Sequence, residues 1–160
     1  MGVIAAGTPD LRQFASSTFT QSLSAMTYPI SKLEGLSAVD AKKLRSVGIR
    51  TTDAYLEAAS TSKGRKALAA KTGFSEQQLL EWANLADYMR IPGMGNGKTK
   101  LLRAAGVTTV RELTHRNPAR LAQAMKDVNT RRKFVSVLPS EKSIGDLIAQ
   151  ARKLPLKITY

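Results

Sequence analysis

The 160-residue sequence contains no cysteine, a single histidine (His115) and few aromatic residues, which make up 6% of the chain. Without cysteine there is no disulfide bond, no thiolate zinc site and no cysteine nucleophile. One histidine also excludes metal sites built from several histidines. No apolar run approaches the ~18 residues that a membrane-spanning helix needs. We therefore expect a cytoplasmic protein that neither holds a metal ion nor crosses a membrane.

Acidic residues are scarce as well, with 12 Asp and Glu against 25 Lys and Arg, for a formal net charge of +13. Residues 28–89 hold nine basic and seven acidic residues, whereas residues 90–160 hold fifteen and four, a net charge of +11. Such a concentration of charge is typical of a surface that binds a polyanion. The alternative is a basic face that only keeps the protein soluble.

Apolar residues make up 42% of the chain, which is enough to form a core in one or two small domains. Their spacing is helical almost throughout, and no segment is a convincing strand. Ser75 and Asn117-Pro118 are typical helix starts, and Gly106 is placed to end a helix. The predicted helices cover residues 38–46, 52–58, 63–72, 75–90, 96 or 97–105, 109–114, 119–127, 130–137 and 140–153.

The chain contains an internal repeat, because residues 33–49 align without gaps with residues 91–107 at an offset of 58. Both copies then continue into a Thr-x-x-x-Leu pattern that begins at Thr52 and at Thr109. We therefore expect two related units, residues 28–90 and 91–160, packed together as one compact domain. The identical pairs are Gly35/Gly93, Lys42/Lys100, Leu44/Leu102, Arg45/Arg103 and Gly48/Gly106.

Residues 1–27 are rich in Ser, Thr and Ala and lack the charged start and continuous apolar stretch of a signal peptide. Three interpretations stay open: a weak helix, a disordered tail, or a leader added by a mis-assigned start, with Met26 as the natural first residue.

The segment Ile91-Pro92-Gly93-Met94-Gly95, between two predicted helices, resembles the core of the helix-hairpin-helix motif of nucleic-acid-binding proteins. Two glycines permit a tight hairpin, and its backbone N–H groups, with the next helix start, can bind an anion. The apolar residue between the glycines should plug the hairpin into the core, and basic side chains on the following helix can contact phosphates. The predicted nucleic-acid-binding residues are Gly93, Met94, Gly95, Asn96, Gly97, Lys98, Lys100 and Arg103.

The first copy departs from this motif. Glu34 replaces the proline, Ser37 replaces the second glycine, and Asp40 stands where the second copy has Lys98. Since carboxylates would weaken a phosphate site, we interpret the first copy as mainly structural. A basic run after the second copy is either a further phosphate contact or a solvated face. The weaker candidate residues are Gly35, Ser37, Lys42, Arg45, Arg131, Arg132 and Lys133.

Residues 28–160 also resemble an uncharacterised bacterial family that is known only as a domain of unknown function with helix-hairpin-helix character. The resemblance rests on three segments and implies a fold, but no substrate or activity. We expect an all-α fold, a SAM-like helical bundle of two pseudo-symmetric helix-hairpin-helix units without significant sheet. The helix over 140–153 should pack beside residues 33–46. The segments are 28–36, 72–91 and 153–160.

Other candidate sites are weaker. Gly93 to Thr99 looks like a nucleotide-binding P-loop, but the required first glycine is Pro92 and the preceding segment is a predicted helix. Trp82 is predicted to lie in the core, and His115 at the surface or at a helix end. No nucleophile–base pair stands out, so we expect no enzyme, cofactor or small-molecule substrate.

These features predict non-catalytic, largely sequence-independent binding of nucleic acid. Duplex DNA is favoured because aromatic residues that stack on single strands are few. RNA remains possible, since phosphate contacts do not distinguish it from DNA. The alternative is an adaptor module whose basic half docks an acidic protein.

Overall fold

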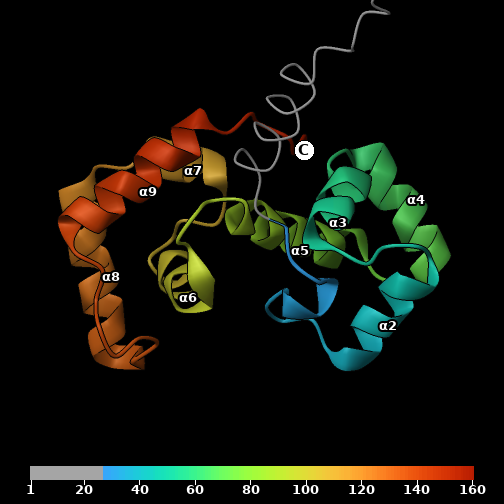
Figure 1. The fold of residues 1–160 in the computed structure, drawn as a ribbon, viewed down its shortest axis with the longest axis horizontal. Helices are drawn as coiled ribbons and strands as arrows, with labels where there is room; N and C mark the ends of the chain where they lie inside the picture. The colour runs from blue at the N-terminus through green and yellow to red at the C-terminus, as the bar shows by residue number, and fades with distance from the viewer. Residues whose placement is uncertain (1–26) are drawn as a thin grey trace, which may run out of the picture.

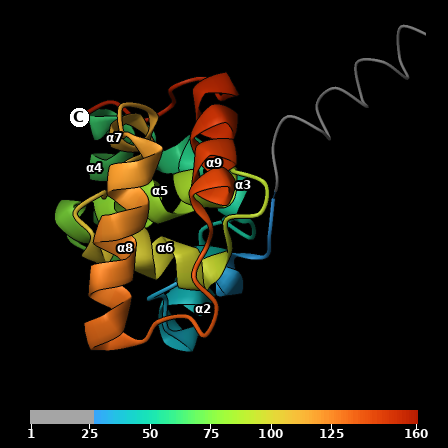
Figure 2. The same ribbon diagram turned by 90° about the vertical axis from the view of Figure 1, so that its left-hand side faces the viewer.

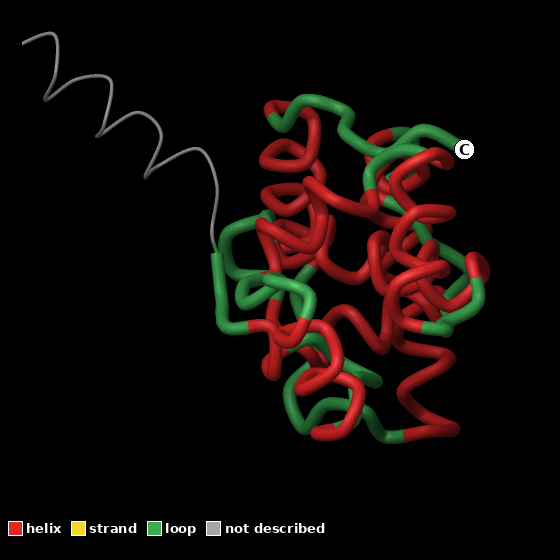
Figure 3. The backbone as a smooth tube through the Cα atoms, turned by 90° about the vertical axis from the view of Figure 1, so that its right-hand side faces the viewer, coloured by secondary structure: helices red, strands yellow, loops and turns green. Residues whose placement is uncertain are grey.

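The computed structural model describes residues 27–160, and every regular element in that range is a helix (Figure 1). The expected all-α fold is confirmed, and an isolated bridge between Pro29 and Thr51 is the nearest approach to a sheet in these residues (Figure 3). No described helix is long and apolar enough to span a bilayer. The expectations for residues 1–26 lie outside the described residues. The elements are η1 (Ile30–Lys32), α2 (Ala38–Ser46), α3 (Thr52–Ala59), α4 (Ser62–Thr72), α5 (Glu76–Met89), α6 (Gly95–Ala104), α7 (Val110–Thr114), α8 (Pro118–Arg132) and α9 (Glu141–Lys153).

Polar side chains fix where most of these helices begin. At every described α-helix except α6, the residue before the first turn accepts a hydrogen bond from the backbone N–H three residues later. Each such cap contributes about 1 kcal/mol. The starts predicted at Ser75 and Asn117 are confirmed. The capping residues are Ser37, Thr51, Thr61, Ser75, Thr109, Asn117 and Ser140.

Residues that are 58 positions apart in the two copies form equivalent hydrogen bonds. The chain leaves α2 at Gly48 (φ 90°) and α6 at Gly106 (φ 92°) through the same turn. The next helices are capped by Thr51 and Thr109, which are 58 residues apart. The Thr-x-x-x-Leu match that paired Thr52 with Thr109 was therefore wrong by one residue. The matching turn bonds run from Gly48 N–H to Arg45 O, from Gly106 N–H to Arg103 O, from Ile49 N–H to Leu44 O and from Val107 N–H to Leu102 O.

Two hydrophobic clusters form the core, one from η1 to α5 and one from the end of α5 to α9. Helix α5 therefore lies between the two halves of the molecule (Figure 1). Trp82 is 3% exposed in the first cluster, which confirms its predicted place in the core. Tyr88 is buried in the second cluster, and its hydroxyl donates to the backbone oxygens of Val107 and Thr109. Burial raises the pKa of Tyr88, so the phenol stays a donor.

The predicted packing of residues 140–153 beside residues 33–46 is wrong. Helix α9 packs against α7 and α8 and lies beside α8 in Figure 2. Its buried residues Ile144 and Leu147 belong to the second cluster, whereas Leu44 of α2 belongs to the first. The amphipathic pattern of α9 is satisfied equally well by either cluster, so the sequence pattern does not choose between them.

The C-terminal tail, not α9, returns to the first half of the chain. The N–H of Thr159 donates to Ser60 O over 2.8 Å, and the Arg65 guanidinium donates to Thr159 O over 2.7 Å. The hydroxyl of Tyr160 donates to the Asn84 side chain. These bonds connect the C-terminal tail to the end of α3, to α4 and to α5.

The predicted break between 119–127 and 130–137 is also wrong, because α8 is one continuous helix to Arg132, with Lys133 (φ 50°) as its C-terminal cap. The predicted helix over 130–137 therefore ends five residues early. No glycine or proline interrupts the chain between these segments. The Asn129 side chain then exchanges two hydrogen bonds with the backbone of Val135, which holds the following loop against the helix.

Arg65 offers a test of the tail contact. It is 5% exposed and also donates to Ala59 O. Replacing Arg65 with Met keeps the aliphatic stem and removes the donors, so two carbonyl oxygens lose their partner. We expect the free energy of unfolding to fall by about 2 kcal/mol. Urea denaturation followed by circular dichroism measures this, with the exposed neighbour Lys66→Met as control. Equal stability of the two variants would contradict the role of the tail.

Candidate functional site

The hairpin between α5 and α6 turns on two glycines. Gly93 has φ 80° and Gly95 has φ 62°, a left-handed region that side chains other than glycine rarely adopt. A Cβ atom at either position would meet nothing within 4 Å, so the backbone conformation and not crowding requires glycine. Both residues are exposed, and the space in front of the hairpin is open to a partner.

Met94 anchors the hairpin from inside. Its side chain is 2% exposed within the second cluster, which confirms the predicted plug. Its N–H donates to Ile91 O over 3.2 Å and closes the turn. Met94 was predicted as a nucleic-acid-binding residue, but this N–H is already used. The backbone donors available to a partner are therefore those that follow it.

The start of α6 carries these donors. No side chain caps α6, unlike the other described α-helices. The N–H groups of Gly95, Asn96 and Gly97 donate to no backbone oxygen outside the helix in the described chain. Unpaired N–H groups and the helix dipole give such an end a partial positive charge that favours an anion.

Gly97 has a second role that the sequence pattern did not indicate. A Cβ atom there would lie 2.7 Å from Cγ1 of Val135, closer than such atoms approach. The loop after α8, held by Asn129, therefore packs directly on the first turn of α6. The glycine was assigned to the anion site alone, but this close contact also requires it.

Lys98 lies at the rim of the hairpin. Its ammonium group donates to Gly93 O over 3.0 Å, which places a positive charge beside the exposed turn. The next residue, Thr99, is 4% exposed and donates to Gly95 O within the helix. Its counterpart in the first copy, Ala41, is 1% exposed, so both are small residues in close helix packing.

Lys100 forms an ion pair across the two halves. Its ammonium group lies 3.5 Å from Oε1 of Glu34, which belongs to the first hairpin. The other carboxylate oxygen, Oε2, is buried and has no hydrogen-bond partner in the described residues. Glu34 was expected to weaken the anion site of its own copy. The structure instead directs its charge at the basic helix of the other copy.

Helices α6 and α8 form a basic concave surface toward the C-terminal end of α6. A depression of about 320 Å³ is lined by residues that include Lys100, Arg103, Arg132 and Phe134. A second depression of about 330 Å³ continues over Ala104 to Arg131. No acidic residue lines either one. The structure thus brings part of the predicted primary site and part of the weaker site onto one surface.

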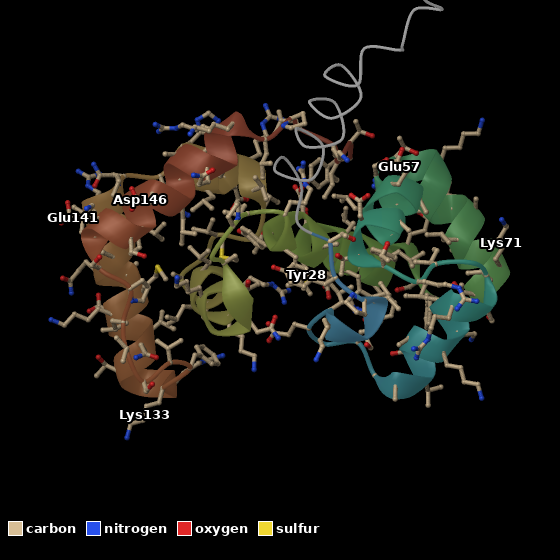
Figure 4. All side chains as sticks on the ribbon, in the orientation of Figure 1. Tyr28, Glu57, Lys71, Lys133, Glu141 and Asp146 are labelled. Atoms are coloured by element: carbon tan, nitrogen blue, oxygen red, sulfur yellow. The ribbon has the colours of Figure 1, made fainter. Side chains whose placement is uncertain are left out.

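Lys133 does not join this surface. It caps the C-terminal end of α8 at the lower tip of that helix, where Figure 4 shows its side chain pointing away.

The first hairpin is closed where the second is open. Gly35 has φ 76°, like Gly93, but Ser37 caps α2 by accepting a hydrogen bond from Asp40 N–H over 3.1 Å. Lys42 and Arg45 are exposed on α2, and no described contact joins them to the basic surface of α6 and α8. The weaker candidates in the first copy therefore form no common site with the second.

The remaining candidates have ordinary surroundings. His115 is exposed and caps the C-terminal end of α7, as predicted. The segment before the hairpin is helix α5, whereas a P-loop follows a strand. Within residues 27–160, no three His, Asp or Glu side chains lie close enough together to hold a metal ion.

A family model described as "Domain of unknown function (DUF4332)" matches residues 34–154, a range that includes α2 to α9 and the second hairpin. Neither the curated proteins nor the solved structures that were compared with the chain contain a match.

The contact between Gly97 and Val135 can be tested through stability. Alanine in place of glycine in a helix usually stabilises a protein by about 0.4–1 kcal/mol. Here we expect Gly97→Ala to destabilise by about 1–3 kcal/mol, because the added methyl group collides with Val135. In a Val135→Ala background the same change should be neutral or stabilising. Urea denaturation of the four proteins measures the coupling. The same cost in both backgrounds would contradict the contact.

Proposed function

The chain belongs to the DUF4332 family, and we propose that it is a non-catalytic protein that binds nucleic acid largely without regard to sequence. The binding surface consists of the open hairpin over residues 91–97 and the adjoining basic face of α6 and α8. Duplex DNA is the favoured partner, and RNA shares the phosphate chemistry that the surface addresses.

We interpret the two halves as helix-hairpin-helix units related by a pseudo-twofold axis. The support is local: both hairpins turn on a glycine with positive φ, Gly35 and Gly93, and both following helices end in the same hydrogen-bonded turn. On this interpretation, the first unit holds the second in place, and the second binds the partner.

The observation that carries the proposal is the combination of an uncapped helix start and a basic surface on the same helix. The N–H groups of Asn96 and Gly97 can donate to one phosphate, while Arg103 and Arg132 lie farther along and can contact others. Helix starts bind phosphates through such N–H groups, and Arg binds them through its planar guanidinium group. The surface therefore offers several phosphate contacts spread over two helices.

Contacts of this kind make binding insensitive to sequence. Phosphate oxygens are the same at every step of a nucleic acid, so backbone N–H groups and guanidinium groups that bind them give orientation and affinity but little base discrimination. Each phosphate contact also releases counterions from the nucleic acid. The affinity should therefore fall steeply as salt is added.

An acidic protein partner is the second candidate, and one observation favours it. A cavity of about 320 Å³ between α7 and α9 is lined by Arg111, His115 and Arg152, next to Leu156, which is 66% exposed. Basic and apolar groups side by side suit an acidic peptide that also carries apolar residues. This cavity uses none of the hairpin residues, so variants separate the two candidates.

Equivalent positions of the two copies provide a matched test. We expect Lys100→Glu/Arg103→Glu to abolish binding to a short duplex DNA, because two positive charges of the proposed surface become negative and repel phosphate. The control is Lys42→Glu/Arg45→Glu, which makes the same change of charge at the corresponding positions of α2. It should bind within about threefold of the wild type, since only weak long-range attraction is lost. Fluorescence anisotropy of labelled DNA measures both.

Salt and competitors complete this test. The slope of log K against log salt should be smaller for an α6 variant that retains measurable binding, such as Arg103→Gln, by about 1. Duplex RNA and heparin are assayed in parallel. Equal losses in the α6 and α2 variants, or equal binding of DNA and heparin, would leave only a general affinity for polyanions and refute the site.

The ion pair of Glu34 with Lys100 gives an independent prediction, in which a substitution raises the affinity for DNA. Glu34→Gln removes the charge that faces Lys100, and it leaves a side chain of the same shape. We expect the DNA affinity to rise about three- to tenfold, because the freed ammonium group can contact phosphate and a repulsive charge is lost. Asp53→Gln, on α3, is the control for the overall change in charge. Anisotropy titrations at low salt compare them, and an unchanged affinity of Glu34→Gln would contradict the role of the pair.

A further inference from the structure

A largely apolar cavity of about 350 Å³ opens beside the hairpin and is lined by residues from 28–32, from the end of α5 and from the start of α6. Its lining residues include the apolar Pro29, Met89 and Ile91 and the aromatic Tyr28. Figure 4 places Tyr28 near the middle of the molecule, between the two halves. A volume of this size lies at the lower end of the range for small-molecule sites, which is about 300–1,000 Å³.

Backbone hydrogen bonds fix the position of Tyr28 at this cavity. The N–H of Tyr28 donates to Oγ1 of Thr52 over 3.1 Å, and the N–H of Thr52 donates to Tyr28 O over 2.8 Å. The N–H of Ile30 donates to Arg50 O over 2.9 Å. The backbone of Tyr28 and of the residues that follow it is therefore fixed before any ligand arrives, which lowers the entropy lost on binding.

Tyr28 also differs from the other three tyrosines of the sequence. The hydroxyl groups of Tyr55, Tyr88 and Tyr160 each donate a hydrogen bond to the chain. The hydroxyl of Tyr28 forms none with the described residues, although the residue is half-buried. Tyr28 lines the cavity and belongs to neither of the two core clusters.

Two polar side chains complete the cavity, and they define its chemistry. Lys32 is exposed at the rim and forms no ion pair with a described carboxylate, and Asn96 adds an amide from the first turn of α6. Asn96 and Gly95 line the cavity and also belong to the uncapped helix start. A ligand that fits both places carries a flat, largely apolar ring and an anionic group next to it.

We infer that this cavity takes one unpaired nucleobase of a nucleic-acid strand, with the adjoining phosphate on the start of α6. The inference rests on the proposed function, whose phosphate site it extends. The ring of Tyr28 offers a surface for stacking, and the amide of Asn96 can hydrogen-bond to the edge of the base. Lys32 supplies a cation for the next phosphate along the strand.

With this assignment, the protein recognises strand ends and junctions, where bases are unpaired. A base inside a continuous duplex must leave its partner and its stack before it can enter a pocket, whereas a base in an overhang does not. A duplex with a single-stranded overhang should therefore bind more tightly than the same duplex with blunt ends. One aromatic cavity is enough for one base, so the low aromatic content of the chain is compatible with this preference.

The test compares a blunt duplex DNA with the same duplex carrying a short overhang, with 2-aminopurine as the first unpaired base. For the full-length protein we expect the overhang to bind about tenfold more tightly, within the range that one base–aromatic stack provides. The fluorescence of 2-aminopurine should fall on binding, because the base stacks on Tyr28.

Two variants assign these effects to the cavity. Tyr28→Leu should reduce the affinity for the overhang to that of the blunt duplex and remove the fluorescence change, while binding of blunt DNA persists. Its backbone hydrogen bonds do not depend on the ring, and circular dichroism checks the fold. Lys32→Gln, at an exposed position, should weaken only the overhang complex. Tyr160→Leu, a tyrosine outside the cavity, is the matched control and should behave as the wild type.

The outcomes separate this inference from the function on which it rests. Equal affinity for both DNAs with constant fluorescence would overturn the assignment of the cavity and leave the phosphate surface standing. Failure to bind either DNA would overturn the proposed function itself. A preference for the overhang that survives in Tyr28→Leu would place the unpaired base elsewhere and refute the cavity.

Discussion

The burial of α5 between two hydrophobic clusters is the constraint on which the rest of this structure depends. Trp82 packs on one side and Tyr88 on the other, and Tyr88 also holds the turn after α6 through two carbonyl oxygens. Asp87 and Arg90 pair inside this region, and Arg90 also donates to Pro155 O of the C-terminal tail. Burial raises the pKa of Asp87, and Arg90 offsets part of that effect. Because the hairpin begins directly after this anchored helix, its direction is set by packing on both sides.

The difference between the two hairpins comes from a small chemical change. A serine hydroxyl closes the start of α2, whereas a second glycine leaves the start of α6 open. The two copies thus share the turn at the first glycine of the hairpin. They differ in whether a side chain accepts a hydrogen bond from the free N–H groups of the next helix. Glu34 adds a second difference, because its carboxylate faces Lys100 of the other copy. The first half therefore offsets part of the positive charge of the second half.

Features governed by neighbours along the chain could be predicted from the sequence. Capping at Ser75 and Asn117, the glycine at the end of α6 and the burial of Met94 and Trp82 depend on local hydrogen bonds and on periodic apolar side chains. The predicted break in α8 was wrong because it had no such local basis: nothing nearby in the sequence ends the helix before Lys133. The glycine requirement at Gly97 could not be predicted fully, because Val135 meets it from a distant loop.

The amino-acid sequence alone was sufficient for the all-α class, the repeat at an offset of 58, the placement of most helices and the excess charge of residues 90–160. These properties follow from short-range chemistry and composition. Only the tertiary structure decided that α9 joins the second cluster, that the tail returns to Arg65, that Glu34 faces Lys100, and that Arg132 lies beside Arg103. An amphipathic helix or a charged side chain does not by itself specify its partner, because many apolar or oppositely charged surfaces would stabilise it equally. The choice among them is made when all the elements bury their apolar faces together.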